Sequence, residues 1–460
     1  MRLAVRMLSV VTMSFADCFK TKSPNGVHFA ERYVSGLLTE TARKNMERMD
    51  ERLGKDDSPD KDLGEDTYQG TQQFISSSPW DESKVYAEIC RRANLRLGGS
   101  KDSTLVIDEC AHAKKGNKSV GASRQWNGRL GKQDNSQVGV HSVLNRGPHT
   151  AMIGTRLALA SEWTNDPERC RQAGVPEERI AQGSPTKIDL ARELIDEAMA
   201  NGVQFACVSF DAFYGRDSGL RRYIDSIDLI YCADIPANAL LFDKKPAAQE
   251  RPAKISDHAT KAEDLAKKII RNKRQPGQTI ILREGENGVV TAKVWARRVW
   301  EWSAGEAQAQ ELWLIVREMP DGKLKLSLCN ASAKATLKRL ARWQASRFYV
   351  ERCFQDAKSH CGMSQYQARG WRAWQHHMAL VALALFLLME ERLTNPMEMP
   401  MLSARDIVEM IEWVLVKQPT EQELIERIER RHAKRAANGS KAVARDRKKL
   451  RQEKRRKPGS

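Results

Sequence analysis

Leu105-Val106-Ile107-Asp108 places a carboxylate directly after an apolar run, and Ala206-Cys207-Val208-Ser209-Phe210-Asp211 repeats the pattern 103 residues later. Each run has the length and composition of a buried strand. Neighbouring strands of an open α/β sheet end at one crevice, so the two aspartates can lie close together. Paired carboxylates are costly unless a cation neutralises them, which indicates Mg²⁺ or Mn²⁺. The alternative is that each Asp merely ends its strand and begins a turn.

A third carboxylate lies in the segment Arg347-Phe-Tyr-Val-Glu351-Arg-Cys-Phe-Gln-Asp-Ala-Lys358, within a helical pattern that spans residues 335–358. At about 100° per residue, Glu351 falls roughly 40° and Lys358 roughly 20° around the helix from Arg347. Val350, Cys353, Phe354 and Ala357 form an apolar stripe beside this polar face. A carboxylate flanked by two cations suits a metal ligand next to phosphate-binding groups. The alternative is a surface ion pair at i, i+4.

These blocks resemble the RNase H-like DDE transposases of bacterial insertion sequences, within the insertion sequence 701 family of the insertion sequence 4 superfamily. Arg347, Glu351 and Lys358 match that group's Y-x2-R-x3-E-x6-K signature, although Gln344 stands at the Tyr position. The first block, Ile107-Asp108-Glu109-Cys110-Ala-His-Ala-Lys-Lys-Gly116, is similar to I-D-[DE]-T-G-x-x-K-K-G, with Cys110 and Ala111 replacing Thr-Gly. The second, Asp211-Ala-Phe-Tyr214-Gly215, is similar to D-x-x-Y-G. The likeness extends from about residue 15 to residue 415.

The resemblance implies a transposase that cuts transposon ends and joins them to target DNA. Asp108, Asp211 and Glu351 would then be both the catalytic residues and the metal ligands, holding Mg²⁺, for which Mn²⁺ can substitute. Three carboxylates with two divalent ions could activate water and stabilise the leaving 3′ oxygen at a phosphodiester. No nucleotide cofactor is expected, and no P-loop motif is present. Synapsis of two DNA ends implies a dimer in the active complex.

The expected fold is α/β: an RNase H-like mixed sheet with a β-rich insertion between the second and third acids. The 103 residues from Asp108 to Asp211 accommodate further strands and a helix, whereas the 140 residues from Asp211 to Glu351 are too many for a plain crossover. We therefore divide the chain into six parts. These are a helical N-terminal DNA-binding domain (1–100), the first part of the core (101–240), the insertion (241–335), the third-acid helix and the helix after it (336–395), C-terminal helices (396–429) and a disordered or helical basic tail (430–460).

Two sets of side chains are candidates for contacts with double-stranded DNA, at the terminal inverted repeats and at the target. Arg347 and Lys358 are the first choices for phosphates near the site, and Lys114, Lys115, Lys118 and Lys132 are further candidates, although such charges usually form a solvated face. The insertion carries Trp295, Trp300, Trp302 and Trp313. We expect most of them to fill its core, and an exposed one, such as Trp300, could stack on a flipped base.

The charge of the chain is concentrated at its C-terminal end. The sequence has 76 Lys and Arg against 59 Asp and Glu, a net charge of +17. Residues 430–460 hold 14 of the cations and 2 of the acids, so the other 429 residues carry only +5. Such a tail is typical of a flexible, sequence-independent grip on DNA.

A membrane location is not expected, because the longest apolar run, Met378–Met389, has twelve residues where a membrane span needs about 20. Met1–Ala16 resembles a poor signal peptide, and we read it as a cytosolic N-terminus. The nine cysteines form no CxxC pair, which favours reduced core thiols. The sequence thus predicts a bacterial cytoplasmic protein associated with the nucleoid. The alternative function is an RNase H-like nuclease or junction-resolving enzyme that cuts without strand transfer, and a DNA-binding protein that has lost chemistry is disfavoured by the intact acidic set.

Overall fold

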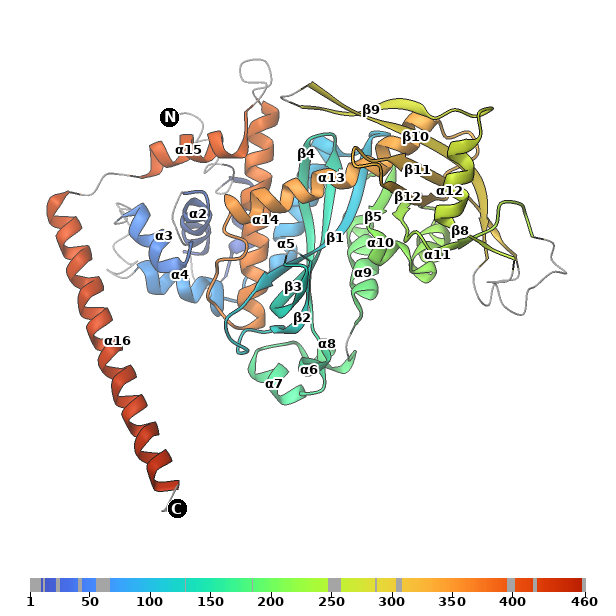
Figure 1. Cartoon of the computed structure of the whole chain (residues 1–460). Helices are drawn as coiled ribbons and strands as arrows, with labels where there is room; N and C mark the ends of the chain where they lie inside the picture. Colours follow the sequence, from blue (N-terminus) through green and yellow to red (C-terminus); the bar gives the residue numbers. More distant parts are fainter. Residues whose placement is uncertain are drawn as a thin grey trace.

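A computed structural model describes the chain except residues 1–9, 11–12, 22–24, 40–43, 55–66, 129, 184, 247–257, 286–287, 303–307, 395–401, 417–419 and 457–460. One ten-stranded mixed sheet runs through its centre in the order β2-β3-β1-β5-β6-β12-β11-β10-β9, with β4 also paired to β3 (Figure 1). Its strands are β1 (Ser103–Ala113), β2 (Ser123–Asn127), β3 (Lys132–Arg146), β4 (His149–Ala158), β5 (Cys207–Phe210), β6 (Tyr231–Asp234), β9 (Gln278–Gly285), β10 (Gly288–Glu301), β11 (Gln310–Glu318) and β12 (Leu324–Cys329). Two short strands, β7 (Leu240–Leu241) and β8 (Thr260–Lys261), pair separately.

Helices lie before, between and after these strands. They are η1 (Ala16–Phe19), α2 (Gly26–Leu37), α3 (Met46–Leu53), α4 (Thr67–Ser76), α5 (Glu82–Leu97), α6 (Ser161–Thr164), α7 (Pro167–Gln172), α8 (Glu177–Ala181), α9 (Lys187–Ala200), α10 (Ala212–Gly215), α11 (Ser218–Ser226), α12 (Ala262–Arg271), α13 (Leu337–Ser359), α14 (Trp371–Thr394), α15 (Ala404–Leu415) and α16 (Glu421–Arg456). The predicted α/β, RNase H-like organisation is confirmed.

Strand β1 forms the middle of the core sheet. It pairs antiparallel with β3 along its length and parallel with β5 from Thr104 to Ile107, and β5 pairs parallel with β6. Strands buried on both faces read as continuous apolar runs, which is why Leu105-Val106-Ile107 shows no alternation. Helix α9 connects β4 to β5 and begins with a capping box at Thr186. Parallel pairing brings the ends of β1, β5 and β6 to one edge.

The segment between β6 and α13 contributes four antiparallel strands, β9 to β12, as expected of a β-rich insertion between the second and third acids. Its last strand, β12, pairs with β6, so the inserted strands extend the core sheet. The strands expected at residues 290–328 are present, whereas β9 was not predicted. Trp295 and Trp302 are buried, as expected for most of the insertion's tryptophans, and Trp300 is half-buried.

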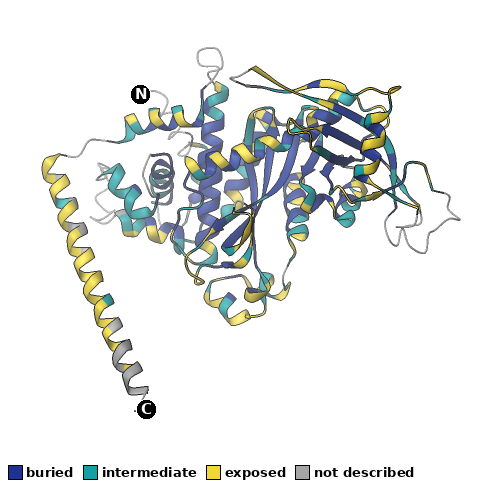
Figure 2. Cartoon of the chain, in the orientation of Figure 1, coloured by how far each residue is buried: buried dark blue, intermediate teal, exposed yellow. Residues whose placement is uncertain are grey.

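Helices α2, α4 and α5 pack against the core helix α14, and α3 packs on α2 and α4; the middle of α14 is buried on all sides (Figure 2). Phe29, Tyr33 and Leu37 recur at helical spacing and predict one helix running toward Leu53, and this prediction is wrong. Helix α2 ends at Leu37, and α3 folds back on it from Met46. A side chain at Gly36 would begin 2.7 Å from Met49 Cβ, so this close approach of the two helices needs glycine.

The predicted basic tail falls mostly within α16, which Figure 1 shows as one long helix leaving the body of the molecule. Of the two expected states, disordered or helical, the helix is the one observed. All nine cysteines lie in the described part of the chain and are buried, and none of them forms a disulfide. Within the described residues, no helix is both long and apolar enough to cross a membrane.

Candidate active site

Asp108 lies within β1, where the parallel pairing with β5 stops. We expected it at the strand's end, but β1 continues to Ala113 because β3 still pairs with it. The Asp108 side chain is only 12% exposed, and its Oδ1 accepts a hydrogen bond from the Glu109 amide at 2.8 Å. Burial raises the pKa of Asp108 to about 7, although the Arg347 guanidinium opposes this rise. A carboxylate held in such surroundings calls for a cation beside it.

Asp211 follows β5 directly and lies on the neighbouring parallel strand. Because Ile107 pairs with Phe210, the two aspartates are the next residues on adjacent strands. The charge of Asp211 adds to the rise in the pKa of Asp108. Asp211 also begins the short helix α10, since its Oδ1 accepts hydrogen bonds from the amides of Phe213 and Tyr214. Asp211 therefore does begin a turn, as the alternative interpretation of the sequence has it. This role is compatible with a place in the candidate site.

The residues after Asp211 explain the local motif. The Tyr214 ring is fully buried, and Gly215 passes against the end of β6. A Cβ at Gly215 would lie 1.8 Å from the Asp234 carbonyl oxygen, which no side chain can satisfy without moving the backbone. Glycine at this position thus lets the turn carrying Asp211 pack on the neighbouring strand.

Glu351 reaches the same edge from α13, which packs against β1, β5 and β6. The predicted apolar stripe is buried at Val350, Cys353, Phe354 and Ala357. Glu351 itself is 61% exposed and lies 3.4 Å from Arg347 Nη2. Lys358 is half-buried about two turns further along the same helix. The shared face of Arg347, Glu351 and Lys358 is as the helical spacing predicts.

The Arg347 guanidinium connects these carboxylates. Nη1 lies 3.1 Å from Asp108 Oδ2, Nη2 lies 3.4 Å from Glu351 Oε1, and Nε lies 3.4 Å from Asp234 Oδ2. Burial alone would lower the pKa of Arg347, but the surrounding carboxylates, with Asp108 first and Asp234 second, raise it overall. Three carboxylates from two strands and a helix therefore already surround one positive charge.

This arrangement can be compared with the needs of a divalent cation. Carboxylate oxygens are the ligands that Mg²⁺ and Mn²⁺ prefer, and a buried, ionisable Asp108 requires a positive neighbour. In the described part of the chain, no three His, Cys, Asp or Glu side chains converge closely enough to hold a metal ion. Arg347 occupies the position between Asp108 and Glu351. The carboxylate oxygens suit a divalent metal ion chemically. For them to surround one, Arg347 would have to release Asp108 or Glu351.

Asp234 is the site residue that sequence reasoning missed. Tyr231-Cys-Ala-Asp234 closes a buried strand with an aspartate, as the runs before Asp108 and Asp211 do, and this was the available signal. Its side chain is 10% exposed and pairs with Lys325 at 2.9 Å. The insertion strand β12, which carries Lys325, therefore contacts the edge of the site directly.

The remaining candidate cations differ in their surroundings. The Lys114 ammonium lies 4.0 Å from the Tyr366 ring centroid, and burial lowers the pKa of Lys114 to about 8. Lys115, Lys118 and Lys132 are exposed near the β2–β3 end of the sheet. The structure thus leaves the exposed lysines open to solvent, whereas Lys114 packs on an aromatic ring.

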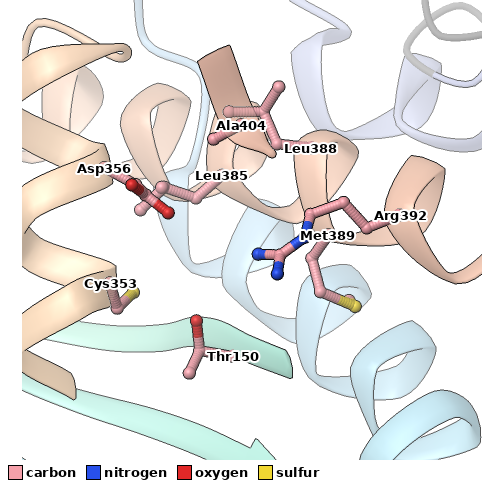
Figure 3. Close-up of a pocket in the computed structure, with 8 residues that line it drawn as sticks. All are labelled: Thr150, Cys353, Asp356, Leu385, Leu388, Met389, Arg392 and Ala404. Carbon is pink, nitrogen blue, oxygen red and sulfur yellow. The ribbon is translucent and has the colours of Figure 1, made fainter. Parts of the chain in front are cut away.

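Two buried histidines of the core helix α14 have structural partners. His376 contacts the carbonyl oxygens of Ile75 and Trp80, both at 3.0 Å, and His377 contacts the Tyr33 hydroxyl at 2.8 Å. These contacts join both side chains to the packing around the core helix. A small cavity of about 20 Å³, room for about one water, lies elsewhere, between α13, α14, α15 and β4 (Figure 3). It is lined by Thr150, Cys353, Asp356, Leu385, Leu388, Met389, Arg392 and Ala404. Asp356 lies about 140° around α13 from Glu351, so this cavity is not part of the site.

Comparison with known proteins shows the family of the chain. Residues 14–289, more than half of the chain, match the family described as DDE superfamily endonuclease. The chain belongs to that family. The matched part of the chain includes Asp108 and Asp211 and stops before α13, so the candidacy of Glu351 rests on its own motif and position.

A relative from Microchaete diplosiphon is described as "Probable transposase for insertion sequence element IS701". It is 30% identical to this chain over 182 residues, which cover 39% of this chain and 43% of the relative. The expected membership of the DDE group is confirmed. The alignment spans less than half of the relative's length, so the two are alike over a part of each protein.

Proposed function

We propose that the protein is a DNA transposase that cuts transposon ends and joins them to target DNA. The single observation that carries the proposal is the meeting of Asp108 and Glu351 at one buried guanidinium, with Asp211 on the adjacent strand. Family membership and the IS701 relative support the same reading. An endonuclease needs such charged groups beside a phosphodiester, because its transition state accumulates negative charge.

Asp108, Asp211 and Glu351 would hold divalent cations, Mg²⁺ in the cell and Mn²⁺ as a substitute. Bound there, the cations would supply the positive charge that activates a water or a 3′-OH and stabilises the leaving oxygen. The protein's own contribution is to fix the carboxylates. The strand register sets Asp108 beside Asp211, and the buried stripe of α13 sets the direction of Glu351. Positioning of this kind lowers the entropic barrier to an in-line displacement.

Basic side chains around the carboxylates would hold the DNA backbone. Arg347 and Lys358 lie on the face of α13 that carries Glu351, and they are proposed to contact phosphates next to the reacting one. Lys114, Lys115 and Lys132 are proposed to extend this contact along the β2–β3 end, the exposed lysines more strongly than Lys114. Trp300 in the insertion is proposed to meet a base.

The other parts of the chain would serve DNA recognition. We assign residues 1–100 to DNA binding, 101–240 and 336–395 to the catalytic core, 241–335 to the insertion, 396–429 to C-terminal helices and 430–460 to a basic tail. Two chains are proposed to hold two transposon ends in the synaptic complex, at the bacterial nucleoid. The long exposed helix α16 supports a role in holding DNA, because its C-terminal part carries most of the net charge.

A strand-transfer assay tests the function. Purified protein is incubated with Mg²⁺, a labelled duplex carrying the element's terminal repeat and a supercoiled target plasmid. The proposal expects cutting at the repeat end and covalent joining of the labelled strand to the plasmid. Cutting without any joined product would favour the alternative, an RNase H-like nuclease or junction-resolving enzyme. Absence of both reactions, with the repeat bound, would contradict the proposal.

A further inference from the structure

Asp234 lies at the site without being one of the three expected acids. It ends β6, directly beside the strand that leads to Asp211, and its backbone pairs with Ser327 of β12. Its carboxylate is fixed by two groups of that strand. The Ser327 hydroxyl donates a hydrogen bond to Oδ1 at 2.6 Å, and Lys325 Nζ lies 2.9 Å from Oδ2. Asp234 therefore has one well-defined orientation.

Helix α13 reinforces that orientation. Gln344 Nε2 donates a hydrogen bond to the Ser327 hydroxyl at 2.8 Å, and Gln344 is almost fully buried. One turn later on the same helix, Arg347 Nε faces Asp234 Oδ2 at 3.4 Å. The Asp234 carboxylate thus contacts Arg347, and strand β12 of the insertion makes the other contacts of this carboxylate. Gln344, Ser327 and Asp234 are buried and joined by hydrogen bonds, so they fix the carboxylate that the guanidinium faces.

Binding of a cation would affect the three contacts of Arg347 differently. Its Nη groups face Asp108 and Glu351, which are the proposed metal ligands, whereas Nε faces Asp234, which is not. A metal ion that takes Asp108 and Glu351 removes the partners of both Nη groups. The contact with Asp234 is the one that can persist, since Lys325 and Ser327 hold Asp234 in place.

We propose that Asp234 is a positioning residue that retains Arg347 at the edge of the site when Asp108 and Glu351 take up the divalent cation. The two Nη groups are then presented to a backbone phosphate of the bound DNA, for which a guanidinium has matching geometry. This inference rests on the proposed function. Without Asp234, Arg347 stays with Asp108 and Glu351 and opposes the incoming cation.

The test uses the full chain and two binding measurements that do not depend on turnover. Calorimetry measures Mn²⁺ affinity, and fluorescence anisotropy measures affinity for a labelled repeat-end duplex in Ca²⁺, with a gel to verify uncut DNA. The variants are Asp234→Asn, Arg347→Met and their combination. Asp102→Asn is the matched control, because Asp102 pairs with Arg339 and Arg342 of the same helix, away from the carboxylates.

We expect Asp234→Asn to weaken both Mn²⁺ and DNA binding by roughly tenfold, because the ion pair that retains Arg347 is lost. Arg347→Met should weaken DNA binding but strengthen Mn²⁺ binding, because the competing positive charge is gone. In the Arg347→Met background, Asp234→Asn should change either affinity by less than about twofold. The Asp102→Asn control should leave both unchanged.

An equal effect of Asp234→Asn in both backgrounds would overturn the proposal, because Asp234 would then act through its own charge. Wild-type affinities in Asp234→Asn would overturn it as well. If that variant fails to fold by circular dichroism, Ser327→Ala, which removes one support of Asp234, should show a smaller loss of the same sign, and no loss would refute the proposal. Asp108→Asn distinguishes failure of this inference from failure of the proposed function. Retained Mn²⁺ binding in that variant contradicts the proposed function itself.

Discussion

Replacing Arg347 by methionine should lower the free energy of unfolding, because Arg347 neutralises the carboxylates at this site. The side chain of Arg347 is 18% exposed, and Asp108 beside it is 12% exposed. Methionine keeps much of the apolar stem and removes the charge. Asp234 retains Lys325 as a partner, and Glu351 is largely solvated, so the loss falls mainly on Asp108.

The expected loss follows from one good contact and two long ones. Nη1 lies 3.1 Å from Asp108 Oδ2, whereas the other two separations are 3.4 Å. A hydrogen bond to a charged group contributes about 1.5–3 kcal/mol, and breaking a buried ion pair costs about 3–5 kcal/mol. We therefore expect the free energy of unfolding to fall by about 3 kcal/mol at pH 8.5. The loss should shrink toward pH 6, because Asp108, with its pKa of about 7, takes up a proton instead.

Urea denaturation in EDTA, followed by circular dichroism, measures this change. Arg339→Met is the matched control, since Arg339 lies on the same helix and pairs with Asp102, whose side chain is 44% exposed. That control should lose no more than about 1 kcal/mol. Combining Arg347→Met with Asp108→Asn should restore most of the stability. An Arg347→Met variant as stable as wild type at pH 8.5 would refute the view that this guanidinium neutralises a buried carboxylate.

Three further outcomes are expected. The raised pKa of Asp108 means that the folded chain keeps this proton to higher pH than the unfolded chain, so metal-free stability should fall between about pH 4 and pH 7, and Asp108→Asn should flatten that slope in thermal melts. Gly215→Ala should cost more than about 2 kcal/mol of unfolding free energy in urea, because its Cβ meets the Asp234 backbone, whereas Gly116→Ala, with open space around it, should be neutral. Truncation after Glu429 should weaken DNA binding and reduce its salt slope in anisotropy titrations, because 14 cations are lost, and an unchanged slope would show that the tail does not contact DNA.

Local patterns predicted the core well where one physical cause dominates. The apolar runs before Asp108 and Asp211 became adjacent parallel strands, because strands buried on both faces require such runs. The stripe at Val350, Cys353, Phe354 and Ala357 became the buried face of α13. In both places burial alone determines which positions are apolar, so the apolar pattern in the sequence predicts the buried face.

The parts that sequence reasoning missed depend on contacts between distant segments. Periodicity did not show that α2 stops and α3 folds back, because the turn is set by the close packing of Gly36 on Met49. Asp234 passed unnoticed because its partners, Lys325, Ser327 and Arg347, lie 91 to 113 positions further along the chain. The insertion's continuity with the core sheet likewise rests on the pairing of β12 with β6, which no local signal reports.

The central claim is that Asp108, Asp211 and Glu351 form one metal-dependent site for DNA cleavage. The most direct measurement is cleavage of the element's own repeat ends in Mg²⁺ by Asp108→Asn, Asp211→Asn and Glu351→Gln, with repeat binding measured in parallel by anisotropy. We predict that each substitution abolishes cutting while the affinity for the repeat stays within a few-fold of wild type. Full cutting by any of the three variants would contradict the claim.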